Sequence, residues 1–321
     1  MKDLKNIARV FNDYSKIWSG REVNKALVTF FEITMNCNLR CEYCYIGQDP
    51  VAYPQGFQPK GLSIDEIKLV ISKISKSSHA LSLYGGEPFL RKDLLEILQF
   101  AKSLDFGSLE VVTNGTLLVK NIKSVELLDV INISYDPTRQ RQYSEQMNKM
   151  LEDALWIRKK LKKSIMFFIT LCEEDQFSDL TDLLNFMQNH KFCAFFQPVR
   201  TKSMIHDLKW FNEIMKSIKD EYPKIFYFNQ IKNYVPLDYN RCLPQLSLSV
   251  TYEGNLVYPC QMFRTRIAGS LLESDVAELW KKGKEKYGTF PNKECENCGY
   301  LCMWDIGNNF RYPWKVNFFN Y

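Results

Sequence analysis

The sequence lacks several features that mark common classes of protein. It contains only three histidines in 321 residues, so few imidazoles are available as zinc ligands or general bases. No uninterrupted apolar run approaches the roughly 18–20 residues that a helix needs to cross a bilayer. The opening stretch, MKDLKNIARVFNDYSKIW, has neither an apolar core nor a small-residue cleavage site, so we expect no secretory signal peptide. These absences lead us to expect a cytoplasmic protein without a transmembrane segment.

Blocks of like charge are absent as well. The formal net charge of +5 comes from lysines and arginines that are scattered over the whole length, and no Arg-rich aromatic stripe occurs. This distribution does not favour binding to nucleic acid. We therefore expect no nucleic-acid partner.

Cysteine, in contrast, is abundant, with ten residues in the chain. Thiols stay reduced in the cytoplasm, so this number favours metal or redox chemistry over disulfides. Cys37, Cys41 and Cys44 lie within one short stretch, MNCNLRCEYCYIG (35–47). A zinc site would need a fourth cysteine or histidine nearby, and the following IGQDPVAYPQGFQPKG offers none. Three thiolates could instead hold three corners of an iron–sulfur cubane and leave one iron open to an outside ligand.

Short β-rich runs alternate with helical patterns over much of the chain. The β-rich runs are 27–34, 79–84, 108–113, 130–135, 164–171 and 192–199, and the helical patterns are 63–76, 91–104, 119–128, 140–162, 176–190 and 205–220. This alternation predicts parallel βαβ units. Six units are too few for a closed eight-stranded barrel, so we expect an α/β fold with a partial (β/α)6 TIM-like barrel. Ligands of such sheets bind at the carboxyl ends of the strands, which is where the cysteine loop lies.

The pattern divides the chain into three segments. We expect an N-terminal helix in residues 1–26, the partial barrel in 27–236 and a small cysteine-rich α+β module in 237–321. In the last segment, SLSVTYEGNLVYPC predicts a hairpin around Glu253-Gly254-Asn255. A helix with the sequence DVAELWKKG follows, with Ser274 as its expected cap.

The order of these motifs resembles the radical S-adenosylmethionine (SAM) superfamily. A CxxxCxxC loop follows the first strand, and YGGEP (84–88) follows the second, as the GGEP motif does in that superfamily. The resemblance implies a 4Fe-4S cluster on Cys37, Cys41 and Cys44, with SAM bound to its open iron. The implied cofactor-binding residues are Tyr43, Gly85, Gly86, Glu87, Pro88, Asn114 and Ser134. We expect the glycines to let the backbone approach the ligand, and Glu87 to face an ammonium group.

The resemblance also implies a reaction. A donor such as flavodoxin or ferredoxin reduces the cluster, SAM is cleaved to methionine and a 5′-deoxyadenosyl radical, and the radical abstracts hydrogen from a substrate. A ribosomal peptide or a small metabolite is the expected substrate. The cysteine pattern at the end of the chain also resembles hopanoid adenosyltransferases, so adenosyl transfer to a lipid or terpenoid is an alternative. A non-catalytic zinc-binding protein is an alternative of a different class.

A second metal site is expected in the C-terminal segment. Cys242, Cys260, Cys295 and Cys298 resemble the ligands of a twitch domain, a shortened relative of the SPASM domain, which implies a second, auxiliary 4Fe-4S cluster. Cys295, Cys298 and Cys302 form an alternative set, and four thiolates that include a CxxC also suit structural zinc. If Cys302 is not a ligand, it is a candidate hydrogen donor to a substrate radical, or a buried spectator.

Overall fold

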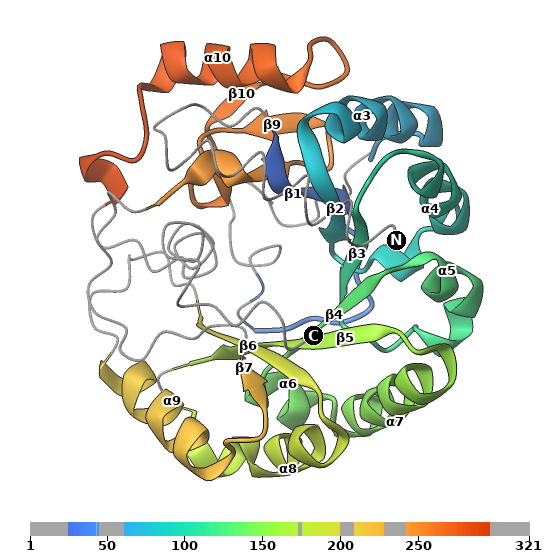
Figure 1. The fold of residues 1–321 in the computed structure, drawn as a ribbon, viewed down its shortest axis with the longest axis vertical. Coiled ribbons are helices and arrows are strands. Elements are labelled where there is room, and N and C mark those ends of the chain that lie inside the picture. Colours follow the sequence, from blue (N-terminus) through green and yellow to red (C-terminus); the bar gives the residue numbers. More distant parts are fainter. Residues whose placement is uncertain are drawn as a thin grey trace.

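A ten-stranded sheet dominates the computed structural model of the chain (Figure 1). The structure describes residues 25–42, 44, 61–172, 175–199, 209–227 and 242–295. The strand order is β10-β9-β8-β1-β2-β3-β4-β5-β6-β7. The strands are β1 (Ala26–Thr34), β2 (Ser78–Gly85), β3 (Ser108–Thr113), β4 (Val130–Tyr135), β5 (Ser164–Leu171), β6 (Cys193–Pro198), β7 (Phe226–Tyr227), β8 (Ser247–Val250), β9 (Asn255–Val257) and β10 (Ile267–Ser270).

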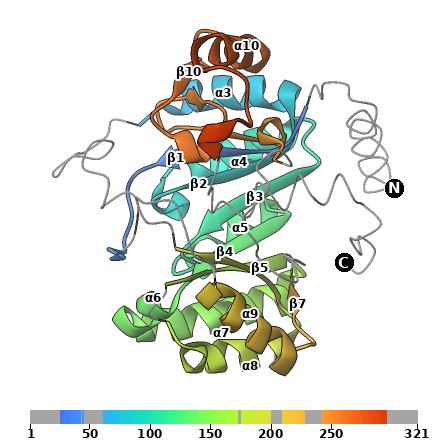
Figure 2. The same cartoon turned by 90° about the vertical axis from the view of Figure 1, so that its left-hand side faces the viewer.

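Strands β1 to β7 are parallel neighbours in chain order, and the sheet curves without closing (Figures 1 and 2). The α-helices of this region lie on its outer side (Figure 1). They are α3 (Ile64–Ser77), α4 (Leu94–Ser103), α5 (Ile122–Leu127), α6 (Pro137–Gln142), α7 (Ser144–Leu161), α8 (Thr181–His190) and α9 (Lys209–Glu221). Short 3-10 turns precede or follow several of these elements: η1 (Pro88–Leu90), η2 (Val119–Asn121), η3 (Phe177–Leu180), η5 (Pro244–Leu246), η6 (Gln261–Phe263) and η7 (Lys293–Cys295).

Alternation along the strands separates the two faces of the sheet. On β1, Phe31 and Ile33 are fully buried and belong to the same apolar core as Ile67 and Ile71 of α3. The residues between them, such as Glu32, therefore point to the inner side of the barrel. Each buried aliphatic or aromatic side chain stabilises the fold by roughly 1.5–3 kcal/mol, so this core fixes the register of the strands.

Helix α3 shows how local sequence starts an element. Ser63 accepts a hydrogen bond from the Glu66 backbone through its hydroxyl, while Glu66 accepts from the Ser63 backbone N at 2.8 Å. This reciprocal cap satisfies two backbone donors at the first turn. The helix therefore begins at a defined residue beside the carboxyl end of β1.

The sheet confirms the α/β partial barrel, and the six expected strands lie within two residues of the observed bounds. The expected hairpin is also present, as antiparallel β8 and β9, but β8 pairs in parallel with β1 and continues the barrel sheet. Helix α10 (Val276–Tyr287) follows β10. The expected cap was wrong, because Asp275 rather than Ser274 precedes this helix and makes no capping side-chain bond.

The expected N-terminal helix and the boundary between 236 and 237 both fall outside the described residues, so both stay predictions. Within the part of the chain that is described, no helix combines the length and the hydrophobicity that crossing a bilayer requires.

Candidate active site

The cysteine loop, residues 35–44, leaves the carboxyl end of β1. Cys37 and Cys41 are partly buried and pack against the apolar core. The Leu39 backbone N donates to the Cys37 sulfur at 3.4 Å, and the Cys44 backbone N donates to the Cys41 carbonyl at 3.2 Å. Burial raises the pKa of the Cys37 thiol. Tyr43 lies outside the described residues.

The two glycines of the GGEP motif lie directly against the start of this loop. The Gly86 backbone N donates to the Thr34 carbonyl at 2.7 Å, and the next backbone N, of Glu87, donates to the Asn36 carbonyl at 2.7 Å. A Cβ atom on Gly85 would lie 2.0 Å from the Thr34 oxygen, and one on Gly86 would lie 2.3 Å from the Asn36 oxygen. Glycine is therefore required here by the close approach of two strand ends within the protein.

The Glu87 carboxylate is fully buried and accepts hydrogen bonds from the chain itself. Its Oε1 accepts from the Phe89 backbone N at 3.1 Å, and its Oε2 accepts from the Asn114 backbone N at 2.8 Å. The Thr113 hydroxyl lies 2.8 and 2.9 Å from the two oxygens. Burial raises the pKa of Glu87. The carboxylate thus ties β2 to β3, and its expected contact with an ammonium group stays a prediction. Pro88 follows as the first residue of η1.

Asn114 joins the end of β3 to the cysteine loop. Its Nδ2 donates to Asn38 Oδ1 at 2.9 Å and points to the Cys37 sulfur at 3.9 Å. Its Oδ1 accepts from the Thr116 backbone N at 3.0 Å. The structure therefore brings Asn114 to the loop, as a neighbour of the first cysteine. Ser134 lies half-buried near the end of β4.

One charged residue at this site was missed by the sequence analysis. Arg139 lies on α6; burial lowers the pKa of its guanidinium, but the charges of Asp136, Cys41 and Cys37 raise that pKa by more. Its Nη1 donates to the Ser134 carbonyl at 2.7 Å, and its Nε lies 3.2 Å from Asp136 Oδ2. Burial raises the pKa of Asp136 to about 6. The sequence SYDPTR indicates this position, because Asp-Pro marks the start of a helix and this helix follows a strand directly, so Arg139 lies in its first turn at the strand end.

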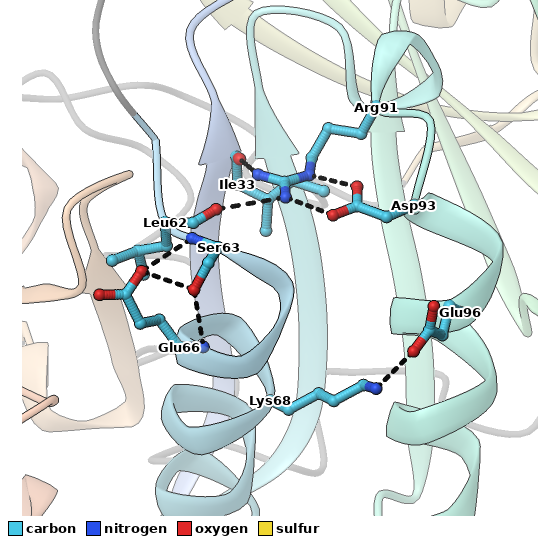
Figure 3. A network of polar contacts seen from close by, with 8 residues as sticks. All are labelled: Ile33, Leu62, Ser63, Glu66, Lys68, Arg91, Asp93 and Glu96. Atoms are coloured by element: carbon cyan, nitrogen blue, oxygen red, sulfur yellow. Dashed lines mark hydrogen bonds and ion pairs between the residues drawn. The ribbon is translucent and has the colours of Figure 1, made fainter.

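Arg91 contacts the end of β1, just before the cysteine loop (Figure 3). Its Nη1 donates to the Ile33 carbonyl at 2.8 Å and its Nη2 to the Leu62 carbonyl at 3.3 Å. Asp93 accepts from the same guanidinium at 2.9 and 2.7 Å. A pocket of about 420 Å³ lies beside this network, lined by residues 33–36, 61–62 and 90–93.

The predicted second site is only partly described. Cys260 is buried just after β9, Cys242 precedes η5, and Cys295 ends η7, whereas Cys298 and Cys302 lie outside the described residues. Within the described ranges, no group of three or more Cys, His, Asp or Glu side chains is arranged to hold a metal ion. Both ligand sets of this site therefore stay predictions.

The residues of the cysteine loop suit an anionic iron–sulfur cluster in their chemistry. They offer three thiols and an N–H donor at the Cys37 sulfur, and iron–sulfur clusters are held by thiolates and respond to hydrogen bonds at sulfur. Among the described residues, however, the three thiols are not grouped as metal ligands.

The fold and the site define a class of protein, an open parallel α/β barrel with a cysteine loop after β1 and a Gly-Gly-Glu turn after β2. Residues 31–187 of this chain match the model of the radical SAM superfamily. This match agrees with the predicted resemblance to radical SAM enzymes.

Curated relatives carry one recurrent name. The chain is 30% identical over 167 residues to "GTP 3′,8-cyclase" of Limosilactobacillus fermentum, covering 49% of each protein. It is 28% identical over 270 residues to "Probable GTP 3′,8-cyclase" of Methanococcus maripaludis, covering 75% of this chain and 86% of that one. The chain spans about half the length of the first curated relatives it matches.

Solved structures share the fold. SuiB of Streptococcus suis, bound to S-adenosylmethionine, superposes with a TM-score of 0.64 at 14% identity, covering 98% of this chain and 76% of that chain. The same protein bound to precursor peptide SuiA gives a TM-score of 0.64 at 15% identity, covering the same shares. These similarities support the partial-barrel fold and do not identify an auxiliary domain.

Proposed function

We propose that this chain binds a 4Fe-4S cluster and SAM at the carboxyl ends of β1 to β4, and that it abstracts hydrogen from an organic substrate. The observation that carries the proposal is the direct linkage of the cysteine loop to the Gly-Gly-Glu turn and to Asn114. When bound, the cluster supplies the electron for reductive cleavage of SAM, a step that cofactors rather than side chains perform. An external electron donor such as flavodoxin or ferredoxin is part of the proposal.

The protein residues hold and surround this site. Glu87 joins the ends of β2 and β3 by accepting from the Asn114 backbone N, and the Asn114 side chain holds the cysteine loop by donating to Asn38 Oδ1. Ser134 is proposed as a SAM contact at the end of β4, together with the turn residues Gly85 and Gly86. Such positioning keeps the reacting atoms in order and excludes water from a reactive radical.

We propose a peptide or a small metabolite without a polyphosphate as the substrate. Two glutamates, Glu32 and Glu110, lie on the inner face of the described barrel. Arg264 pairs with Glu32 at 2.9 Å, and burial raises the pKa of Glu110. These three described side chains are two carboxyl groups and one guanidinium, and the guanidinium is already paired with Glu32, so they provide no net positive charge for a triphosphate. The peptide-bound neighbour SuiB has the same fold, which supports a peptide.

GTP is the second candidate substrate, because relatives in sequence are named GTP 3′,8-cyclase. The two candidates are separated by adding GTP to the reduced enzyme with SAM. We expect GTP to leave the rate of 5′-deoxyadenosine formation unchanged. A GTP-dependent increase together with a new nucleotide product would favour the cyclase reaction instead.

The proposal is tested with Cys41→Ala after anaerobic reconstitution with iron and sulfide. We expect wild-type protein to form 5′-deoxyadenosine from SAM under a strong reductant, and the variant to form none and to lose about one cluster of iron. Cys193→Ala, at the start of β6, is the matched control and keeps SAM cleavage. Zinc or no metal in the wild-type loop would favour the non-catalytic zinc protein.

The auxiliary site is a separate part of the proposal, on Cys242, Cys260, Cys295 and Cys298. We expect Cys298→Ala to keep SAM cleavage and to stop substrate turnover. Normal turnover by this variant would exclude the site. If the product carries an intact adenosyl group, the reaction is adenosyl transfer to a lipid or terpenoid, and Cys302 has no role as a hydrogen donor.

A further inference from the structure

A carboxyl group on the inner side of the barrel lacks a partner of opposite charge. Glu110 alternates along β3 with Leu109 and Val111, which belong to the apolar core, so its side chain points into the barrel. Ser108 Oγ donates to its Oε1 at 3.1 Å, and Asn132 Nδ2 donates to its Oε2 at 3.2 Å. Both donors are neutral, and no cation among the described residues acts on this carboxyl. A carboxylate shielded from bulk water is normally paired, so Glu110 leaves a place for a cation.

Two buried polar atoms beside Glu110 also have no hydrogen-bond partner. Asn132 is 1% exposed, and its Oδ1 accepts no hydrogen bond. Ser82 is fully buried, pairs with Glu110 in the register of β2 and β3, and has an unpartnered Oγ. Leaving a buried acceptor without a donor is unfavourable. The cluster of these three side chains therefore has acceptors to spare, and it complements a group that brings both positive charge and several N–H bonds.

An apolar wall lies beside this cluster. Strands β3 to β6 stand side by side in the barrel (Figure 1). Glu110 and Val112 of β3 are partly exposed on the inner side. Met166 and Phe168 of β5 are partly exposed too, and the Phe168 ring lies 5.4 Å from that of Phe195 on β6, between centroids. A molecule inside the barrel therefore meets one carboxyl group next to apolar and aromatic side chains.

We propose that Glu110 is a substrate-binding residue that accepts hydrogen bonds from a primary ammonium group, with Asn132 Oδ1 as a second acceptor. This inference rests on the proposed function, and it narrows the substrate to a peptide or a small metabolite that carries an amine. An ammonium group supplies three donors, and a hydrogen bond between charged groups is stronger than a neutral one. Glu110 lies four residues before Asn114, roughly 13 Å in an extended strand, so the amine binds deeper in the barrel than the proposed SAM site.

The experiment compares two fluorescent probes, dansylcadaverine, which ends in a primary amine, and its neutral N-acetyl derivative. Each is titrated at pH 7 with the full chain after anaerobic reconstitution, and fluorescence anisotropy gives the Kd. We expect wild-type protein to bind the amine about 10-fold more tightly than the acetylated probe, and Glu110→Gln to bind both equally. Glu96→Gln is the matched control, because it removes the same charge from a side chain that is 58% exposed, and it keeps the preference.

A second pair of variants leaves Glu110 in place and changes its neighbour. Val112 lies two residues further along β3 and faces the same side of the sheet. Val112→Lys puts a positive charge beside the carboxylate, so we expect it to remove the preference for the amine. Val112→Met adds a side chain of similar length without charge and keeps the preference. This pair carries the test if circular dichroism shows that Glu110→Gln does not fold, and a preference lost equally in both variants would contradict the role of charge.

Two competitors identify the source of the amine. Displacement of dansylcadaverine by the peptide acetyl-Gly-Lys-Gly-amide, but not by its norleucine counterpart, supports a lysine-bearing peptide, whereas displacement by n-pentylammonium alone supports a small amine. Displacement by neither, equal binding of both probes by wild-type protein, or a preference that survives in Glu110→Gln would overturn the inference. Wild-type protein that prefers the amine but forms no 5′-deoxyadenosine from SAM would instead overturn the proposed function and leave the amine site in place.

Discussion

Glu87 illustrates how a single side chain can serve the scaffold of a site rather than its ligand. Each of its carboxylate oxygens accepts a backbone N–H, one from Phe89 and one from Asn114. A buried carboxylate with fixed donors on both oxygens cannot turn to another partner without leaving one of them unsatisfied. The motif that predicts ligand binding is therefore also a joint between two strands.

Glu87→Gln tests this role, because each carboxylate oxygen accepts a backbone N–H. In glutamine one of the two oxygens is replaced by an NH2 group, which would face a backbone N–H in either orientation of the amide. We therefore expect the free energy of unfolding of the cofactor-free protein to fall by about 1–3 kcal/mol. Urea unfolding followed by circular dichroism measures it. Glu110→Gln is the control, because its donors, Ser108 and Asn132, have rotatable side chains. An unchanged stability in Glu87→Gln would leave only a ligand role for this residue.

The sequence predicts some residues of the site and not others. Cys37, Gly86 and Asn114 can be predicted because each directly follows a β-rich run, and that position is visible within one short segment. Two of the donors to Glu87, Thr113 and Asn114, lie 26 and 27 residues away along the chain, and Asn38 of the cysteine loop bonds to Asn114, 76 residues away. Such contacts depend on which strands become neighbours, so periodicity within one segment does not reveal them.

At the scale of elements, the junction of β1 and β2 controls the site. The two strand ends approach so closely that only glycine fits at the turn, and two backbone hydrogen bonds of 2.7 Å join them. The loop with the cysteines begins immediately beyond this junction. Any shift of the junction therefore displaces the proposed metal ligands.

Gly86→Ala tests this dependence. Its Cβ would meet the carbonyl oxygens of Asn36 at 2.3 Å and Met35 at 2.7 Å, which are backbone atoms that cannot rotate away. We expect a loss of about 1–3 kcal/mol in the free energy of unfolding and reduced iron uptake on reconstitution. Gly61→Ala is the control, since its nearest neighbour lies at 3.8 Å. Equal iron uptake by both variants would show that the junction does not position the loop.

The network around Arg91 gives a pH-dependent prediction. The pKa of Asp93 is lowered by its hydrogen bonds to the Arg91 guanidinium. A carboxyl with a lowered folded-state pKa stabilises the fold above its unfolded pKa of about 3.9, and this stability is lost as the pH falls through the folded-state pKa. We expect Asp93→Asn to cost under about 1 kcal/mol at pH 7, because the pair is partly exposed.

The check is urea unfolding of this variant and of wild type between pH 7 and the lowest pH at which both fold. The difference between them should shrink below about pH 4. Glu96→Gln is the control, since its pair with Lys68 is at the surface, with the glutamate 58% exposed (Figure 3). A difference that stays constant with pH would mean that the charge of Asp93 has no part in the effect.

Elements were predicted more completely than their connections. The alternation of β-rich and helical patterns predicts β1 to β6 correctly, because buried apolar residues recur at regular positions along these strands. The pairing of β8 with β1 joins segments more than 200 residues apart, and β8 is only four residues long. No pattern within so short a strand specifies its neighbour, so the sequence alone predicts a separate module for this hairpin.

At the scale of the whole molecule, β1 connects the two parts of the chain. It pairs with β2 on one side and with β8 on the other. Glu32, fully buried on β1, accepts from Arg264 Nη2 at 2.9 and 3.0 Å, and Arg264 follows Cys260 by one short turn. An ion pair therefore crosses the predicted domain boundary, between the strand that precedes the cysteine loop and the residue that follows η6. The barrel and the described C-terminal segment should unfold as one cooperative unit.

Arg264→Gln tests that coupling, because it removes the cation from a buried carboxylate. We expect a cost of about 3–5 kcal/mol in the free energy of unfolding, and partial recovery in the Glu32→Gln/Arg264→Gln double variant, which buries no charge at this position. Urea unfolding, followed both by circular dichroism and by tryptophan fluorescence, should give one transition in every variant. Lys282→Gln is the control, because its pair with Glu278 is exposed on α10 and should contribute under about 0.5 kcal/mol. Two separate transitions in wild-type protein, or a double variant that loses as much as the sum of the single ones, would show that the two parts fold independently of this pair.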